Sequence, residues 1–113
     1  MPARFAVGFV AKDAPFIIEL QDEAKIRHAR RIVAGSERLK VHVHGTIVAM
    51  PATYNPDYSF HLDPETIDFF ELAAEVCDAA PRYVEAHLAE IGGAFLPDAH
   101  WCPWASRVEA EVT

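Results

Sequence analysis

Alternating apolar and polar positions mark strands at both ends of the chain. Residues 5–9 alternate large apolar with smaller side chains, and residues 16–20 repeat the pattern. Because successive strand side chains point to opposite faces, this predicts two strands, joined as a hairpin by the turn-forming residues 12–15. A third alternating run predicts a final strand over residues 107–112.

The clearest strand pattern lies in the middle of the chain, over residues 39–49. It predicts that one face carries aliphatic side chains and the other carries polar ones. Gly45 is expected to mark a bulge in this strand. A shorter strand is predicted over 58–62, with His61 on its outward face. The aliphatic face is formed by Leu39, Val41 and Val43, and the polar face by Lys40, His42 and His44.

Helical spacing appears twice. Asp22 is a good N-cap and Gly35 a good C-terminal stop, which predicts a helix between them. Its apolar stripe is Ile26, Ala29 and Val33, widened by Ile32. A second helix is predicted from 80 to 91, with Pro81 in its first turn and Gly92-Gly93 ending it. Its expected buried stripe is Ala80, Val84, Leu88 and Ile91.

The segment 69–77 fits either a helix or a strand, and its alternation favours a strand with Phe70, Leu72, Ala74 and Val76 facing inward. The segment 94–104 is expected to be a loop. The order β-β-α-β-β-β-α-β predicts one α+β domain over residues 1–113. Its sheet would be mixed but mostly antiparallel, with about five or six strands and two helices on one face.

Composition narrows the classes of function. The chain has 113 residues, 51% of them apolar, so a real core is expected. Its formal net charge of −7 argues against a nucleic-acid partner, because phosphate backbones would be repelled. No apolar run reaches the roughly 18 residues needed to span a bilayer, so no membrane association is expected. The N-terminus is a poor signal peptide, which favours a cytoplasmic location.

Histidines suggest one candidate site. His42 and His44 leave the same face of their predicted strand, and His61 is expected on the outward face of the next strand. If the strands are neighbours, these rings and Glu75 would converge on zinc or another borderline divalent metal, which could support hydrolysis. The alternative is an ordinary polar sheet face. The metal hypothesis depends on strand register.

The two cysteines are more consistent with a structural role than with a catalytic one. Cys77 and Cys102 are expected either to form a disulfide or to pack as reduced thiols. Cys77 as a nucleophile would need a base such as His61 and a lowered thiol pKa. The neighbouring carboxylate of Asp78 would raise that pKa, which argues against catalysis.

Rigid aromatic loops support the leading hypothesis, a small non-catalytic binding module for a protein or carbohydrate partner. The alternative role for these rings is to close the end of the core. A further hypothesis is a protease inhibitor that presents loop 50–58 or 95–104. The residues expected to bind the partner are Tyr54, Tyr58, His100, Trp101 and Trp104.

Three short motifs resemble a known family when taken together. They are Ser59-Phe60-His61-Leu62-Asp63-Pro64, Glu75-Val76-Cys77-Asp78 and Trp101-Cys102-Pro103-Trp104. The sequence over about residues 15–112 resembles a family of small, largely uncharacterised bacterial domains. It is also similar to the N-terminal domain of a slime-mould protein described as a calcium-dependent hydrolase or adhesion protein. The resemblance implies a stand-alone or appended module, often exported, and implies no catalytic residues.

Overall fold

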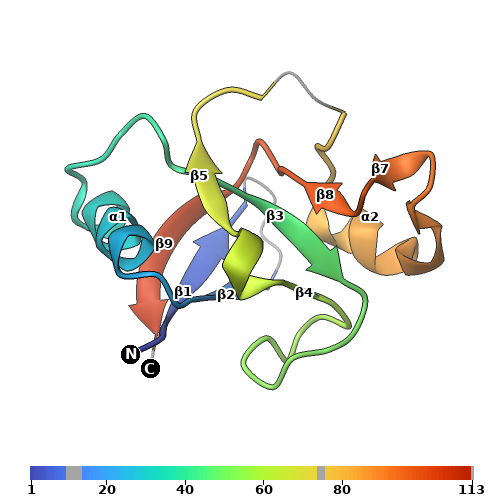
Figure 1. Cartoon of the computed structure of the whole chain (residues 1–113), viewed down its shortest axis with the longest axis horizontal. Coiled ribbons are helices and arrows are strands. Elements are labelled where there is room, and N and C mark those ends of the chain that lie inside the picture. Colours follow the sequence, from blue (N-terminus) through green and yellow to red (C-terminus); the bar gives the residue numbers. More distant parts are fainter. Residues whose placement is uncertain (10–13, 74–75, 113) are drawn as a thin grey trace.

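Two small antiparallel sheets form the centre of the computed structural model, which describes residues 1–9, 14–73 and 76–112 (Figure 1). The first sheet has the strand order β2-β1-β9. In the second sheet, β3 pairs with β4, with β5 and with β8. The strands of the two sheets are β1 (Ala3–Gly8), β2 (Phe16–Leu20), β9 (Arg107–Val112), β3 (His42–Val48), β4 (His61–Leu62), β5 (Asp68–Phe70) and β8 (His100–Trp101).

The predicted hairpin and the final strand are confirmed. β1 and β2 pair antiparallel with Phe5 opposite Ile18 and Val7 opposite Phe16, and β9 pairs with the other edge of β1. Phe5, Val7, Phe16 and Ile18 are all buried. The alternation of apolar side chains therefore places one face of this sheet against the core, as period-two patterning requires.

The face assignment along β3 is also confirmed between residues 42 and 48. Val43 and Ile47 are buried, whereas His42 and His44 lie on the outer face. The predicted strand was too long at its start, because Leu39 lies outside β3 and is exposed. The bulge expected at Gly45 is not present: Gly45 pairs in register with Trp101, and it marks a close approach, because an added Cβ would lie 3.3 Å from Ile67 Cγ1.

Helix α1 (Glu23–Ala34) has the caps that the sequence predicts. The Asp22 carboxylate accepts a hydrogen bond from the Lys25 amide, and Gly35 closes the helix at φ +83°. Ile26, Ala29 and Ile32 are buried, and the helix packs against β9 and β2. Val33, predicted in the stripe, is partly exposed.

The predicted strand over 69–77 is wrong beyond Phe70, and the prediction that Phe70 faces inward is wrong as well, because Phe69 is buried and the Phe70 ring lies beside His42 and His44 on the outer face. β5 ends at Phe70, which pairs with His42, the first residue of β3. Before His42, the Val41 amide donates to the Leu39 carbonyl oxygen and the Lys40 amide to the Glu37 carboxylate, so this segment does not extend the pairing and the chain leaves the sheet. Leu72 and Val76, expected inside, are 84% and 87% exposed. Ala74 lies outside the described residues.

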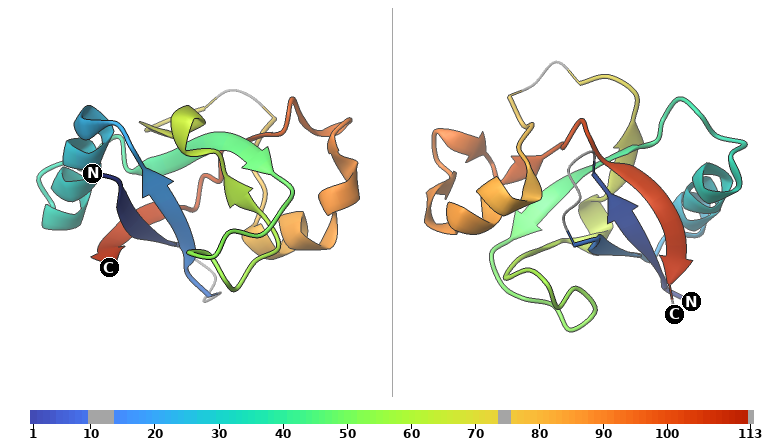
Figure 2. Two further views of the ribbon diagram at one scale, coloured as in Figure 1. Left: turned by 60° about the horizontal axis from the view of Figure 1, so that its bottom comes forward. Right: turned by 180° about the vertical axis from the view of Figure 1, so that it is seen from behind.

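The two helices lie at opposite ends of the molecule, and the prediction that they share one face is wrong (Figures 1 and 2). Helix α2 (Pro81–Ala86) is also shorter than predicted and is followed by a separate 3-10 turn at Leu88–Glu90. Val84 is buried, but Ala80 is exposed. None of the helices in the described part of the chain is long and apolar enough to span a bilayer.

Short strands replace the predicted loop 94–104. β6 (Ile91–Gly92) and β7 (Phe95–Pro97) pair in parallel, and β8 then joins β3. The described residues therefore contain more, and shorter, strands than expected, divided among separate sheets. The coarse α+β class is confirmed.

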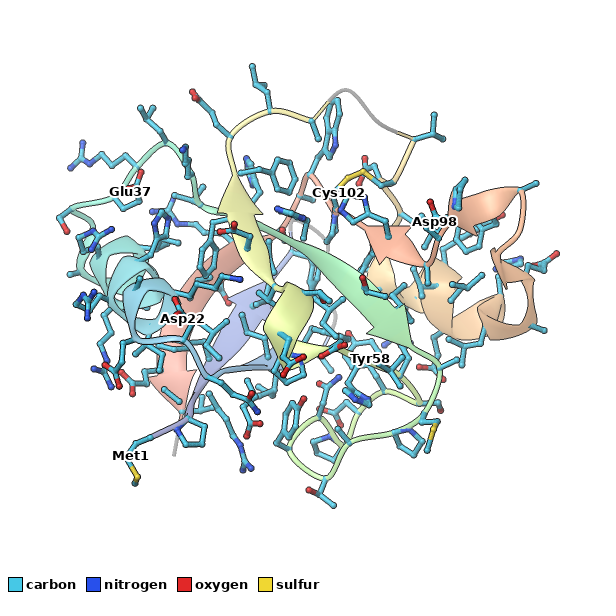
Figure 3. All side chains as sticks on the ribbon, viewed as in Figure 1. Met1, Asp22, Glu37, Tyr58, Asp98 and Cys102 are labelled. Carbon is cyan, nitrogen blue, oxygen red and sulfur yellow. A yellow bond between two sulfur atoms is a disulfide. The ribbon has the colours of Figure 1, made fainter. Side chains whose placement is uncertain are left out.

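Aromatic rings fill the space between the two main sheets. Phe16 lies at the centre, with its ring centroid 5.2 Å from that of Tyr58, 5.1 Å from that of Phe60 and 5.2 Å from that of Trp101. Beside this core, Cys77 and Cys102 form a disulfide, drawn in yellow in Figure 3. The disulfide joins the segment after β5 to the segment after β8.

Candidate functional site

The two tryptophans of the Trp-Cys-Pro-Trp motif have opposite environments. Trp101 is 1% exposed, and its indole Nε1–H donates to the Ala79 carbonyl oxygen at 2.9 Å. Trp104, three residues later, is 47% exposed. Trp101 therefore belongs to the core, and Trp104 is the ring of this motif that a partner can reach.

The turn 102–106, which carries Trp104, is fixed on two sides. The Cys77–Cys102 disulfide is accompanied by a backbone bond from the Cys102 amide to the Cys77 carbonyl oxygen at 2.8 Å. The Trp104 amide donates to the Asp78 carboxylate at 2.9 Å. Asp78, considered above for its effect on thiol chemistry, thus orders the backbone of the exposed tryptophan.

Ser106 closes the other end of the same turn. Its buried hydroxyl donates to the Pro103 carbonyl oxygen at 2.6 Å and accepts from the Val43 amide at 3.0 Å. The Nδ1 atom of the His42 ring lies 2.6 Å from the Ser106 carbonyl oxygen. Because a carbonyl only accepts, His42 must carry its proton on Nδ1. These bonds connect the turn firmly to β3.

Beside Trp104 lies a groove of about 320 Å³, named here the Trp104 groove. Its apolar surface comes largely from Phe9, Val41, Trp104 and Ala105, and two exposed ionic side chains, Arg107 and Glu109, stand at its rim. At Gly8 in its wall, an added Cβ would meet only the carboxylate of Glu109, which is the flexible end of an exposed side chain. The lining residues are Gly8, Phe9, Val41, His42, Trp104, Ala105, Ser106, Arg107 and Glu109.

The histidines expected at one metal site lie apart. His42 bonds Ser106, whereas His61 Nδ1 lies 2.7 Å from the Met50 carbonyl oxygen. His61 pairs with Val48, four residues along β3 from His44, or about 13 Å at the usual strand rise. Glu75 lies outside the described residues. Within residues 1–9, 14–73 and 76–112, no three histidine, cysteine or acidic side chains form a group that could hold a metal ion.

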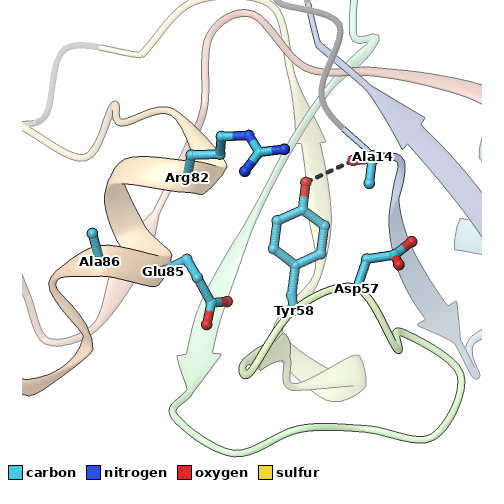
Figure 4. A pocket seen from close by; sticks show the side chains of 6 residues that line it. All are labelled: Ala14, Asp57, Tyr58, Arg82, Glu85 and Ala86. Atoms are coloured by element: carbon cyan, nitrogen blue, oxygen red, sulfur yellow. Dashed lines mark hydrogen bonds between the residues drawn. The ribbon is translucent and has the colours of Figure 1, made fainter.

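The aromatic loop before β4 turns mostly inward. Tyr58 is buried, and its hydroxyl donates to the Ala14 carbonyl oxygen at 2.6 Å (Figure 4). The cavity drawn there, with Arg82 and Glu85 in its wall, measures about 160 Å³ and is small for a ligand site.

Tyr54 is half-buried, with the Arg4 guanidinium 4.9 Å from its ring centroid. Burial raises the pKa of Tyr54, and the nearby Glu19 charge acts in the same direction. The phenol therefore keeps its proton at neutral pH, and its ring faces the charge of Arg4 rather than an open cavity.

His100, the remaining residue of the expected binding set, lies apart from the groove and faces His44 from β8. The sequence reasoning missed Phe9, Val41, Arg107 and Glu109 as neighbours of Trp104. These four come from three strand-forming segments far apart in the chain, and no local motif connects them.

The hypothesis that Cys77 is a thiol nucleophile is not supported, because Cys77 is part of the disulfide. Both cysteines of the chain are bonded to each other and buried, so neither sulfur can act as a thiolate in this state.

Comparison with known proteins supports the family resemblance at a coarse level. Searches among curated proteins and among solved structures each found no match. The family model described as the BP-74 N-terminal domain matches residues 1–113. The chain therefore belongs to the BP-74 N-terminal domain family.

Proposed function

We propose that the domain is a non-catalytic binding module that holds an apolar side chain of a protein partner in the Trp104 groove. The observation that carries this proposal is the half-exposed Trp104 ring on a turn fixed by a disulfide and side-chain bonds. Tryptophan buries a large area at low entropic cost, and a fixed backbone lowers that cost further. Such rings dominate the energy of many interfaces.

The size and composition of the groove favour a protein partner over a carbohydrate. A volume of about 320 Å³ is at the lower end of the roughly 300–1,000 Å³ typical of ligand sites, enough for one side chain. Its apolar walls suit an aliphatic or aromatic group. Arg107 and Glu109 at the rim can orient the partner's backbone, whereas a sugar would need more hydrogen-bonding groups within the groove itself.

A displayed random-peptide library tests this proposal. Peptides selected on the domain would be synthesised and titrated into ¹⁵N-labelled protein, whose two indole N–H signals report on Trp101 and Trp104 separately. The Trp104 signal should shift and the Trp101 signal should stay. Trp104→Ala should weaken binding about 30-fold, the size expected for an interface hot spot, without changing the melting temperature.

Tyr83 provides the matched control, because it is an aromatic residue of α2 that is 52% exposed and is not among the residues that line the Trp104 groove. Tyr83→Ala should leave peptide affinity unchanged. The proposal fails if Trp104→Ala binds selected peptides as well as the natural sequence does. It also fails if a glycan array binds through Trp104 while no peptide does, since that outcome supports the carbohydrate alternative.

The protease-inhibitor hypothesis stays a prediction and gains little from loop 50–58. Asn55 and Tyr58 in that loop are buried, and Asn55 bonds both β2 and Phe60 through its side chain. An inhibitory loop needs exposed side chains at its centre.

The disulfide is typical of oxidising compartments, so it supports an exported domain rather than the cytoplasmic location expected from the N-terminus.

A further inference from the structure

A second feature, on the outer face of the β3 sheet, involves His44 and His100. Thr46 of β3 lies opposite His100 of β8, so His44 is the diagonal neighbour of His100 on the same face. Both rings are partly buried, and their planes are nearly perpendicular at 82°. The strand pairing therefore presents two imidazoles to each other from a rigid scaffold.

The nitrogen atoms of the two rings are 3.1 Å apart, between Nδ1 of His44 and Nε2 of His100. This distance fits a hydrogen bond, and it also fits the spacing of two ligands on one metal ion. Imidazole nitrogens bound to zinc at about 2.0–2.1 Å, with an angle of about 90–110° between them, are separated by about 2.8–3.4 Å. One ion, lying to one side of the line between the two nitrogens, could thus bind both rings in place of the hydrogen bond that joins them.

We propose that His44 and His100 form a two-imidazole chelate for a borderline divalent cation such as Zn²⁺, Cu²⁺ or Ni²⁺, with water completing the coordination. Imidazole suits these ions, whereas Mg²⁺ and Ca²⁺ prefer oxygen ligands. Both rings bind in the neutral form, and the ring that donates the hydrogen bond must move its proton to its other nitrogen. This proposal is independent of the Trp104 groove.

The scaffold explains why these two histidines are favoured over the others. His42 and His61 each have Nδ1 at a backbone carbonyl oxygen, which leaves Nε2 as a possible ligand, but neither ring has a hydrogen bond to a second imidazole among the described residues. His28 and His87 likewise lie against carbonyl oxygens. Only the pair His44–His100 brings two ring nitrogens together within the described part of the chain. The disulfide at Cys102, two residues beyond His100, helps to hold β8 in place.

Calorimetric titration of untagged, chelator-treated protein with ZnCl₂, CuSO₄ and MgCl₂ tests the proposal. We expect one saturable site for Zn²⁺ or Cu²⁺ at about pH 7.5 and none for Mg²⁺. His44→Asn and His100→Gln should each weaken binding at least about tenfold. His87→Asn, whose ring packs against Tyr83 and Phe95 instead, should leave metal binding unchanged.

A spectroscopic measurement keeps the test independent of how the variants fold. In the unmodified protein, Zn²⁺ should shift the ¹⁵N resonances of His44 Nδ1 and His100 Nε2 together and leave those of His61 and His87 in place. The proposal is overturned if no saturable binding occurs below about 1 mM metal, if His44→Asn binds as well as the natural sequence, or if the shifts fall on other histidines.

Discussion

Removing the disulfide is the sharpest test of how the Trp104 turn is stabilised. Cys77 and Cys102 are 25 residues apart in the chain, and their Cα atoms are 5.1 Å apart in the structure. In the chain-entropy model, a bond closing a loop of this length restricts the unfolded chain by about 3.5 kcal/mol at 25 °C. The double change Cys77→Ala/Cys102→Ala should therefore lower the free energy of unfolding by about that amount.

For a chain of this length, that loss corresponds to a fall in melting temperature of about 15 °C. Urea unfolding followed by circular dichroism would measure the free energy, and thermal unfolding would measure the melting temperature. Natural protein reduced with dithiothreitol is the matched control, because it loses the bond but keeps both sulfur atoms. The reduced protein and the double variant should show similar losses.

A loss below about 1 kcal/mol in both samples would refute this reasoning. It would mean that the unfolded chain is already restricted, or that the backbone bond from Cys102 to Cys77 and the indole bond from Trp101 to Ala79 hold the two segments without the disulfide. The position of the Trp104 indole signal in the reduced protein would then show whether the turn keeps its conformation.

Three further predictions concern buried and paired side chains. Trp101→Ala should destabilise the fold by about 3–5 kcal/mol in urea unfolding, because it empties the core between the sheets. Asn55→Ala should cost about 3 kcal/mol, because it leaves the Ile17 amide and the Phe60 carbonyl oxygen without their side-chain partner. The pKa of the Glu111 carboxyl should lie below its ordinary value, because Arg30 donates to it, and Arg30→Gln should raise it in an NMR titration. Since the pKa is lowered in the folded state, the small stabilisation from this exposed pair is present at neutral pH and lost as the pH falls through the folded pKa.

Much of the local structure could be predicted from the sequence. The caps of α1, the hairpin of β1 and β2, and the faces of β3 from 42 to 48 all follow from signals a few residues long. Such signals suffice because capping bonds and side-chain alternation act between near neighbours in the chain.

The segment after Phe70 shows where local signals stop being enough. Its alternation continues through Val76, but the segment before β3 has its amides bonded to Leu39 and Glu37, so the pairing with β5 ends at Phe70. The two helices show the same limit. Their apolar stripes predict burial, yet only the tertiary arrangement decides that one helix packs on β9 and the other lies at the far end.

The candidate site depends on tertiary structure even more strongly. Trp101 and Trp104 are the same residue type three positions apart, and no pattern within the motif indicates that the first is 1% exposed and the second 47%. The sequence by itself determined which segments alternate, where α1 begins and ends, and which side chains could bind. Which of those side chains meet, and which reach solvent, was decided by strand pairing and the disulfide, because these join segments that carry no local signal of each other.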